Sequence, residues 1–160
     1  MQRFVSAIRK SVEDQNWLAA VFLALNMPDI CSAVQNPYDR NVGNRYRQWF
    51  ERYLKGKYKI GLTEFTAEDC YQFRCKCLHQ GILMRDNDEK FNLTPPIPPF
   101  YIHMNTQNGV IQIQVDIFCE DMCQAVEQWI VDMEPHAAVA ARMKELIEIK
   151  FPPGFIAFAN

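Results

Sequence analysis

Residues 66–81, TAEDCYQFRCKCLHQG, contain both the start and the stop signals of a helix. Thr66 is a residue type favoured at the N-cap, and the two acids that follow it suit a first turn, where the helix dipole attracts negative charge. Gly81 suits the position just beyond the last turn, because glycine readily adopts a positive φ. The sequence therefore predicts a helix over Ala67–Gln80.

Three more helices are predicted before this one. Residues 2–12 carry apolar side chains at helical spacing. A second helix, apolar over most of its surface, is expected over Asp14–Asn26 and should be stopped by Pro28. A third helix should begin at Asn44 as its N-cap and end at Gly56. The first half of the chain thus indicates a helical bundle.

The sequence pattern after these helices is no longer helical. Residues 86–90, DNDEK, indicate an exposed turn, and residues 93–100, LTPPIPPF, indicate a stiff extended segment. Residues 111–117 alternate apolar and polar side chains, as in a strand with one wet face. The Asn-Gly pair at 108–109 is a favoured hairpin turn. A β-hairpin is therefore predicted near residues 100–118.

Helical patterns return in the last third of the chain. Helices are expected over residues 119–133 and 136–149, with Pro135 between them. The apolar tail at 151–160 should dock on the body. The predicted fold class is mainly α, a bundle of about five to six helices with an inserted β-hairpin, and all 160 residues should form one domain.

The composition and the apolar segments indicate in which cellular compartment the protein is expected. Its 49% apolar and 22% charged residues are typical of a globular domain. The first residues are amphipathic and charged, unlike a signal peptide, and the longest apolar run, Trp17 to Leu25, is too short to cross a bilayer. We therefore expect a cytoplasmic protein with no membrane partner, whose six cysteines are reduced thiols.

Charge is distributed unevenly along the chain. Residues 40–59 carry seven basic side chains and one acid, whereas residues 116–148 carry eight acids and two basic side chains. This distribution predicts a basic side and an acidic side of the molecule.

The basic segment is a candidate for RNA binding. Arg45, Arg47 and Arg52 could hold phosphates, and a base could stack on Tyr46. The alternative is that the basic residues complement the C-terminal end of their helix and that the aromatic side chains belong to the core.

Arg74 and His79, in RCKCLH, form the candidate catalytic pair. RNA is cut without a metal ion when its 2′-hydroxyl attacks the adjacent phosphate. That reaction needs a proton carrier active near neutral pH and a fixed cation beside the phosphorane oxygens. Histidine and arginine supply these roles, although five residues along a helix turn the two side chains apart by about 140°. They could converge if the helix end unwinds or a second copy completes the site.

This R-x-x-x-x-H motif on a late helix of a small bundle resembles the HEPN (higher eukaryote and prokaryote nucleotide-binding) ribonucleases. The resemblance covers residues 1–81 at most and departs from the family at Cys75, where a polar residue is usual. It implies a metal-independent endoribonuclease with a composite site in a homodimer, of the kind found in toxin–antitoxin or antiphage systems. It assigns RNA cleavage to Arg74 and His79, and Asp69, one turn earlier, could orient Arg74.

Other interpretations of the same residues stay open. Arg74 could extend to a nearby acid and His79 could cap the helix end, which would leave a non-catalytic module that binds a protein partner or an antitoxin.

Four cysteines are candidate zinc ligands, namely Cys70, Cys77, Cys119 and Cys123. Their spacing favours buried thiols instead, and we expect no metal. Common nucleotide-binding, metalloprotease and serine-hydrolase motifs do not occur, so no cofactor is expected.

Overall fold

The structure is a computed structural model that describes residues 1–83 and 90–150. These residues form six α-helices, a short 3-10 turn and two small sheets. The elements are α1 (Gln2–Glu13), α2 (Trp17–Gln35), α3 (Val42–Tyr53), η1 (Lys55–Lys57), β1 (Lys59–Ile60), β2 (Thr63–Glu64), α4 (Ala67–Gln80), β3 (Phe91–Thr94), β4 (Thr106–Gln107), β5 (Val110–Gln114), α5 (Val115–Met133) and α6 (Ala137–Lys144). The predicted fold class, mainly α with an inserted β-hairpin, is confirmed.

Two predicted segments cannot be placed. The apolar tail at 151–160 lies outside the described residues, and so does the turn predicted at 86–90, except for Lys90.

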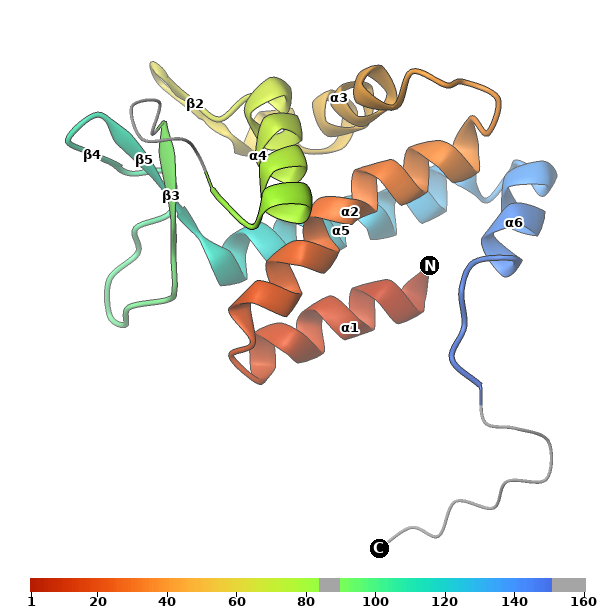
Figure 1. Cartoon of the computed structure of the whole chain (residues 1–160), viewed down its shortest axis with the longest axis horizontal. Helices are drawn as coiled ribbons and strands as arrows, with labels where there is room; N and C mark the ends of the chain where they lie inside the picture. Colours follow the sequence, from red (N-terminus) through yellow and green to blue (C-terminus); the bar gives the residue numbers. More distant parts are fainter. Residues whose placement is uncertain (84–89, 151–160) are drawn as a thin grey trace, which may run out of the picture.

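Helices α1, α2 and α5 form the centre of the molecule, where they pack against one another (Figure 1). The amphipathic α1 buries Val5 and Ile8, whereas α2 and α5 are apolar on several faces because each is covered by more than one neighbour. Trp129 of α5 is fully buried. Its indole N–H donates to Gln35 Oε1 over 3.1 Å, which ties α5 to the end of α2.

The prediction that Pro28 stops the second helix is wrong, because α2 continues to Gln35 with Pro28 inside it. Proline lacks the N–H that would bond to the carbonyl one turn earlier, so its presence has a local cost. The turns beyond Pro28 bury Cys31 and Val34 against the bundle, and this burial offsets the cost. The helix begins at Trp17, three residues later than predicted, and Asn16 is its N-cap.

Helices α3 and α4 pack on α2 and on each other. The N-cap of α3 is Asn41 rather than the predicted Asn44, and its side chain accepts from the Asn44 backbone N–H over 3.1 Å. Helix α4 has the predicted bounds. The Thr66 hydroxyl accepts from the Asp69 N–H, and the Asp69 carboxylate accepts from the Thr66 N–H, so the two close a capping box.

The predicted hairpin is present, with Asn108 and Gly109 at positive φ between β4 and β5. Strand β5 also pairs in parallel with β3, a strand that was not predicted; only its last two residues, Leu93 and Thr94, belong to the predicted extended segment. The strand predicted to reach residue 117 ends at Gln114. Val115 and Phe118 begin an apolar helical pattern, and both are buried, so packing against the bundle overrides the alternation.

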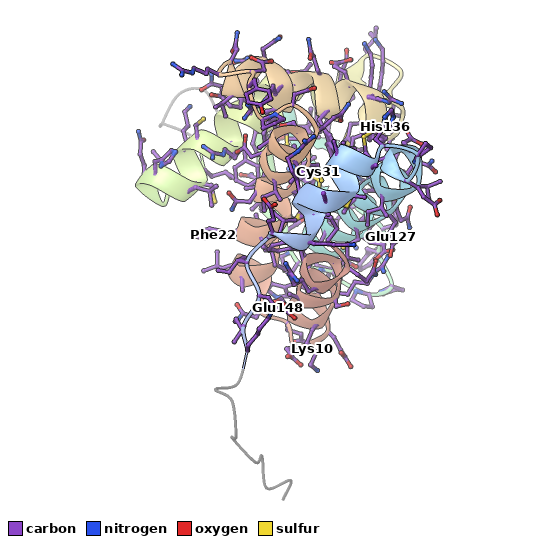
Figure 2. The ribbon with its side chains drawn as sticks, turned by 90° about the vertical axis from the view of Figure 1, so that its right-hand side faces the viewer. Lys10, Phe22, Cys31, Glu127, His136 and Glu148 are labelled. Atoms are coloured by element: carbon purple, nitrogen blue, oxygen red, sulfur yellow. The ribbon has the colours of Figure 1, made fainter. Side chains whose placement is uncertain are left out.

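Helix α6 closes the far end of the bundle, opposite the sheet (Figure 1). It ends at Lys144, five residues before the predicted end. Arg142 donates from Nε to the Val34 carbonyl over 2.6 Å and from Nη2 to the Gln35 carbonyl over 3.2 Å, so it caps the C-terminus of α2. His136, before the start of α6, is exposed (Figure 2).

Helix α2 is long and apolar enough, by length and composition alone, to cross a membrane. Half of that stretch is buried inside the protein, as in the core helix of a globular fold.

Candidate functional site

Helix α4 brings Arg74 and His79 together on one chain. Nη1 of Arg74 lies 3.1 Å from Nε2 of His79. The helix stays regular as far as Gln80, and Gly81, with φ of 68°, ends it by donating to the Cys77 carbonyl. The reach of the arginine side chain therefore closes the five-residue spacing, with neither unwinding nor a second copy.

Arg74 forms an ion pair with an acidic side chain on a different helix. Its Nε lies 2.6 Å from Oδ2 of Asp29 on α2, and the two side chains are only 18% and 14% exposed. This contact is an ion pair between two largely buried side chains. Burial raises the pKa of Asp29, while the charge of Arg74 acts in the opposite direction. One edge of the guanidinium thus faces Asp29 and the other faces His79.

Asp69 does not orient Arg74, contrary to the prediction. Its carboxylate is buried in the capping box of α4, where it also pairs with Lys90 at 3.0 Å. Burial acts to raise the pKa of Asp69, but the hydrogen bonds from Thr66 and the charge of Lys90 hold it below its usual value. Asp69 therefore stabilises the start of the helix, and Asp29 occupies the position expected of it beside Arg74.

The basic and acidic regions do not form two separate sides of the molecule. Lys57 lies 2.6 Å from Asp121, and Arg52 lies 3.0 Å from Asp132, so the basic segment pairs directly with α5. Arg47 pairs with Glu68, and its guanidinium lies 4.4 Å from the centre of the Tyr71 ring. Much of the positive charge predicted to attract RNA is therefore compensated within the chain.

The predicted base-stacking on Tyr46 does not agree with its position. Tyr46 is fully buried, and its hydroxyl donates to the Leu25 carbonyl over 3.2 Å. Arg45 is also buried, and its Nη1 donates to the carbonyls of Asn36 and Asp39. Arg47 and Arg52 remain partly exposed, with 34% and 59% of their side-chain surface accessible. The two remaining arginines are thus the better placed for contact with RNA phosphates.

The cysteines are free thiols, and all except Cys75 are buried. Burial raises the pKa of Cys70 to about 12 and that of Cys123 to about 12, which keeps these thiols protonated. Within residues 1–83 and 90–150, no three histidine, cysteine or acidic side chains cluster as metal ligands would. The cysteines therefore behave as small core residues.

Asp29 is the residue of the candidate site that the sequence analysis missed. The stop assigned at Pro28 placed Asp29 in a loop, far from any helix face. The apolar residues Ile30, Cys31 and Val34 continue the helical spacing beyond Pro28 and were the signal that could have corrected it. With α2 extended, Asp29 lies on a helix that packs against α4.

Comparison of the chain with protein-family models, with curated proteins and with solved structures gives no match.

Proposed function

We propose that this protein is a metal-independent endoribonuclease of HEPN-like type. The observation that supports this proposal best is the 3.1 Å contact between Nη1 of Arg74 and Nε2 of His79, with Asp29 at 2.6 Å on the other edge of the guanidinium. An arginine and an exposed histidine are held together as one unit, and these are the two groups that the reaction requires.

The proposed reaction uses the 2′-hydroxyl of RNA as its nucleophile. His79 takes the proton of that hydroxyl, the 2′-oxygen forms a bond to phosphorus, and the bond from phosphorus to the 5′-oxygen breaks. The 5′-oxygen receives the proton that His79 took up, which leaves a 2′,3′-cyclic phosphate and a 5′-hydroxyl and restores His79. Arg74 donates to the phosphorane oxygens as their negative charge increases.

Asp29 is a positioning residue in this scheme. In the contact with Arg74, Nε2 of His79 is the acceptor, because a guanidinium can only donate. When a phosphate takes over the Nη1 donor, Nε2 becomes free to accept a proton. The ion pair with Asp29 fixes the Nε edge of Arg74 and leaves the Nη edge directed at His79.

The same proposal includes the partners and the location. RNA is the substrate, Arg47 and Arg52 contact its backbone, and the protein acts in the cytoplasm as a homodimer, with an antitoxin as a further protein partner. The homodimer is tested by light scattering on the purified chain, in which a mass near twice 18.7 kDa is expected.

The test is an RNA cleavage assay in EDTA with a single-stranded RNA of mixed sequence. The wild type should produce ends with cyclic phosphate, and His79→Ala and Arg74→Ala should each lower the rate by at least about a hundredfold. His136→Ala, which removes an exposed histidine just before the start of α6, is the matched control and should keep full activity.

Two results would contradict the proposal. Cleavage that survives both active-site changes would indicate a contaminant or another site. Absence of cleavage of every RNA tried, with the protein shown to be folded by circular dichroism, would leave Arg74 and His79 without the proposed role.

A non-catalytic interaction module is the second candidate function, and a different region favours it. The proline-rich loop after β3 presents Ile97, Phe100 and Tyr101 with 48%, 67% and 66% exposure. Adjacent exposed apolar side chains of this size are typical of a surface that binds another protein. If the folded protein cleaves no RNA, capture of an antitoxin expressed from a neighbouring gene, lost in Phe100→Ser, would support this function.

A further inference from the structure

A polar pocket of about 130 Å³ lies between the C-terminal half of α2 and helix α3. Its lining residues are Ser32, Gln35, Asn36, Arg45, Gln48, Trp49, Arg52 and Tyr53. The lining contains two arginines and no carboxylate. Neither Arg74 nor His79 belongs to it, so it is distinct from the candidate ribonuclease site.

Two buried N–H donors in this lining have unmet hydrogen-bonding capacity. Arg45 is 9% exposed and Trp49 is 3% exposed. In the part of the chain that the structure describes, neither Nε of Arg45 nor Nε1 of Trp49 has a hydrogen-bond partner. A buried donor without an acceptor is costly, and the great majority of such groups in folded proteins are paired. Both donors call for an acceptor oxygen.

The positive charge of Arg45 also indicates that the pocket binds an acceptor oxygen. Its contacts are backbone carbonyls of Asn36 and Asp39, and within residues 1–83 and 90–150 it makes no ion pair. Arg52, with 59% of its side chain exposed, adds a second cation, although one of its nitrogens pairs with Asp132. The charge of Arg45 acts on the Asp29 carboxylate, but the two side chains form no direct ion pair. A buried cation without a direct ion-pair partner favours an anionic ligand, because an anion supplies that partner and accepts the unmet hydrogen bonds.

We infer that this pocket binds a small oxyanion, namely a phosphate or carboxylate group, through Arg45, Trp49 and Arg52. The pocket is well below the roughly 300–1,000 Å³ of sites that enclose drug-sized ligands, so it suits one such group rather than a whole nucleotide. The group comes either from a free small anion or from the backbone of RNA.

The experiment measures binding of inorganic phosphate and of acetate to the full chain by calorimetry and by thermal unfolding. Sodium chloride at matched ionic strength is the reference, which removes general salt effects. Phosphate or acetate should raise the unfolding temperature in a saturable way, as expected of a ligand that binds only the folded state.

Two variants test whether the effect comes from the pocket. Trp49→Phe removes the indole N–H and keeps an aromatic ring, and Arg52→Gln removes the more exposed cation, so neither depends on replacing the buried Arg45. Each should weaken anion binding by about tenfold, the loss expected of one charge-assisted or buried hydrogen bond. Lys59→Gln, which removes a cation on the β1–β2 hairpin, is the matched control and should bind like the wild type.

The outcomes separate the two sources of the oxyanion. A short RNA that displaces phosphate from the His79→Ala protein, which keeps the pocket intact, assigns the site to the RNA backbone. Phosphate binding that RNA does not displace assigns it to a free anion. The inference is overturned if phosphate and acetate act no differently from chloride, or if both pocket variants bind as tightly as Lys59→Gln.

Discussion

Arg74 contacts helix α2 and Arg45 contacts the segment just after it, but only Arg74 meets a carboxylate. Arg74 lies 2.6 Å from Asp29, whereas Arg45 donates to the carbonyls of Asn36 and Asp39. The first arginine is therefore fixed in charge and position, as a group that stabilises a reaction should be. The second keeps its charge available to a ligand. The difference shows that the surroundings of an arginine, rather than its presence, decide which role it suits.

The largest effect is expected from removing the carboxylate that distinguishes the two. Asp29→Asn keeps the shape of the side chain but leaves the Arg74 guanidinium largely buried without its counter-charge. Breaking a pair of this kind should lower the free energy of unfolding by about 3 kcal/mol, measured by urea denaturation. RNA cleavage should fall as well, because Arg74 is then free to turn away from His79.

Asp132→Asn is the control for this change. This change breaks the ion pair between Asp132 and Arg52. The charged groups of this pair lie 3.0 Å apart, and the Arg52 side chain is 59% exposed. An exposed pair contributes at most about 1 kcal/mol, so this variant should remain close to the wild type in stability. Equal losses in the two variants would mean that burial does not distinguish Asp29.

A second buried polar group gives a pH-dependent effect. His103 is 5% exposed; its Nδ1 accepts from the Gln114 N–H, and burial lowers the pKa of its imidazole. His103 therefore takes up a proton at a higher pH in the unfolded chain, near pH 6.5, than in the folded protein. Stability should fall as the pH drops below about 6.5, by at most about 1.4 kcal/mol per pH unit.

Urea denaturation between pH 7.5 and 5.5 measures this dependence. His103→Gln, whose amide oxygen can accept from the same N–H, has no titrating group at this position and should lose less stability over the same range. Identical slopes in the two proteins would assign the pH dependence to other groups.

The parts of the fold that the sequence predicted correctly are those with local signals. Helix α4 has the predicted bounds because Thr66 and Gly81 act within one turn of its ends. The extension of α2 past Pro28 and the parallel pairing of β3 with β5 depend on neighbours that are distant in sequence. Local rules therefore failed at these two places, where burial and sheet pairing decide the structure.

The candidate site divides along the same line. Arg74 and His79 were identified because both lie in one short motif. Asp29 was not identified, because it lies 45 positions before Arg74. Asp69 was predicted to orient Arg74 because it is close to Arg74 in sequence. The structure uses Asp69 for the capping box, which is itself a local interaction.

Removal of the capping box at the start of α4 should have a smaller effect, and it should affect stability but not cleavage. Thr66→Ala removes one half of the capping box and should lower the free energy of unfolding by about 1 kcal/mol. RNA cleavage measured below the unfolding temperature should remain unchanged, because the box lies at the opposite end of α4 from His79. A loss of cleavage as large as that of Asp29→Asn would return Asp69 and its surroundings to the site.

The smallest effect on stability is expected at Arg45, and it tests the comparison from the other side. Arg45→Met keeps the apolar length of the side chain and removes a charge that forms no direct ion pair with a carboxylate among the described residues. The carbonyls that lose a donor belong to Asn36 and Asp39, which are exposed, so water can replace it. The free energy of unfolding should change by no more than about 0.5 kcal/mol, since replacing a buried charge by an apolar side chain of similar size is often neutral. Arg74→Met, measured in parallel, leaves Asp29 without its cation and should lose clearly more stability at pH 7. If Arg45→Met proves the more destabilising of the two, Arg45 is required by the fold itself, and its charge is not held available for a ligand.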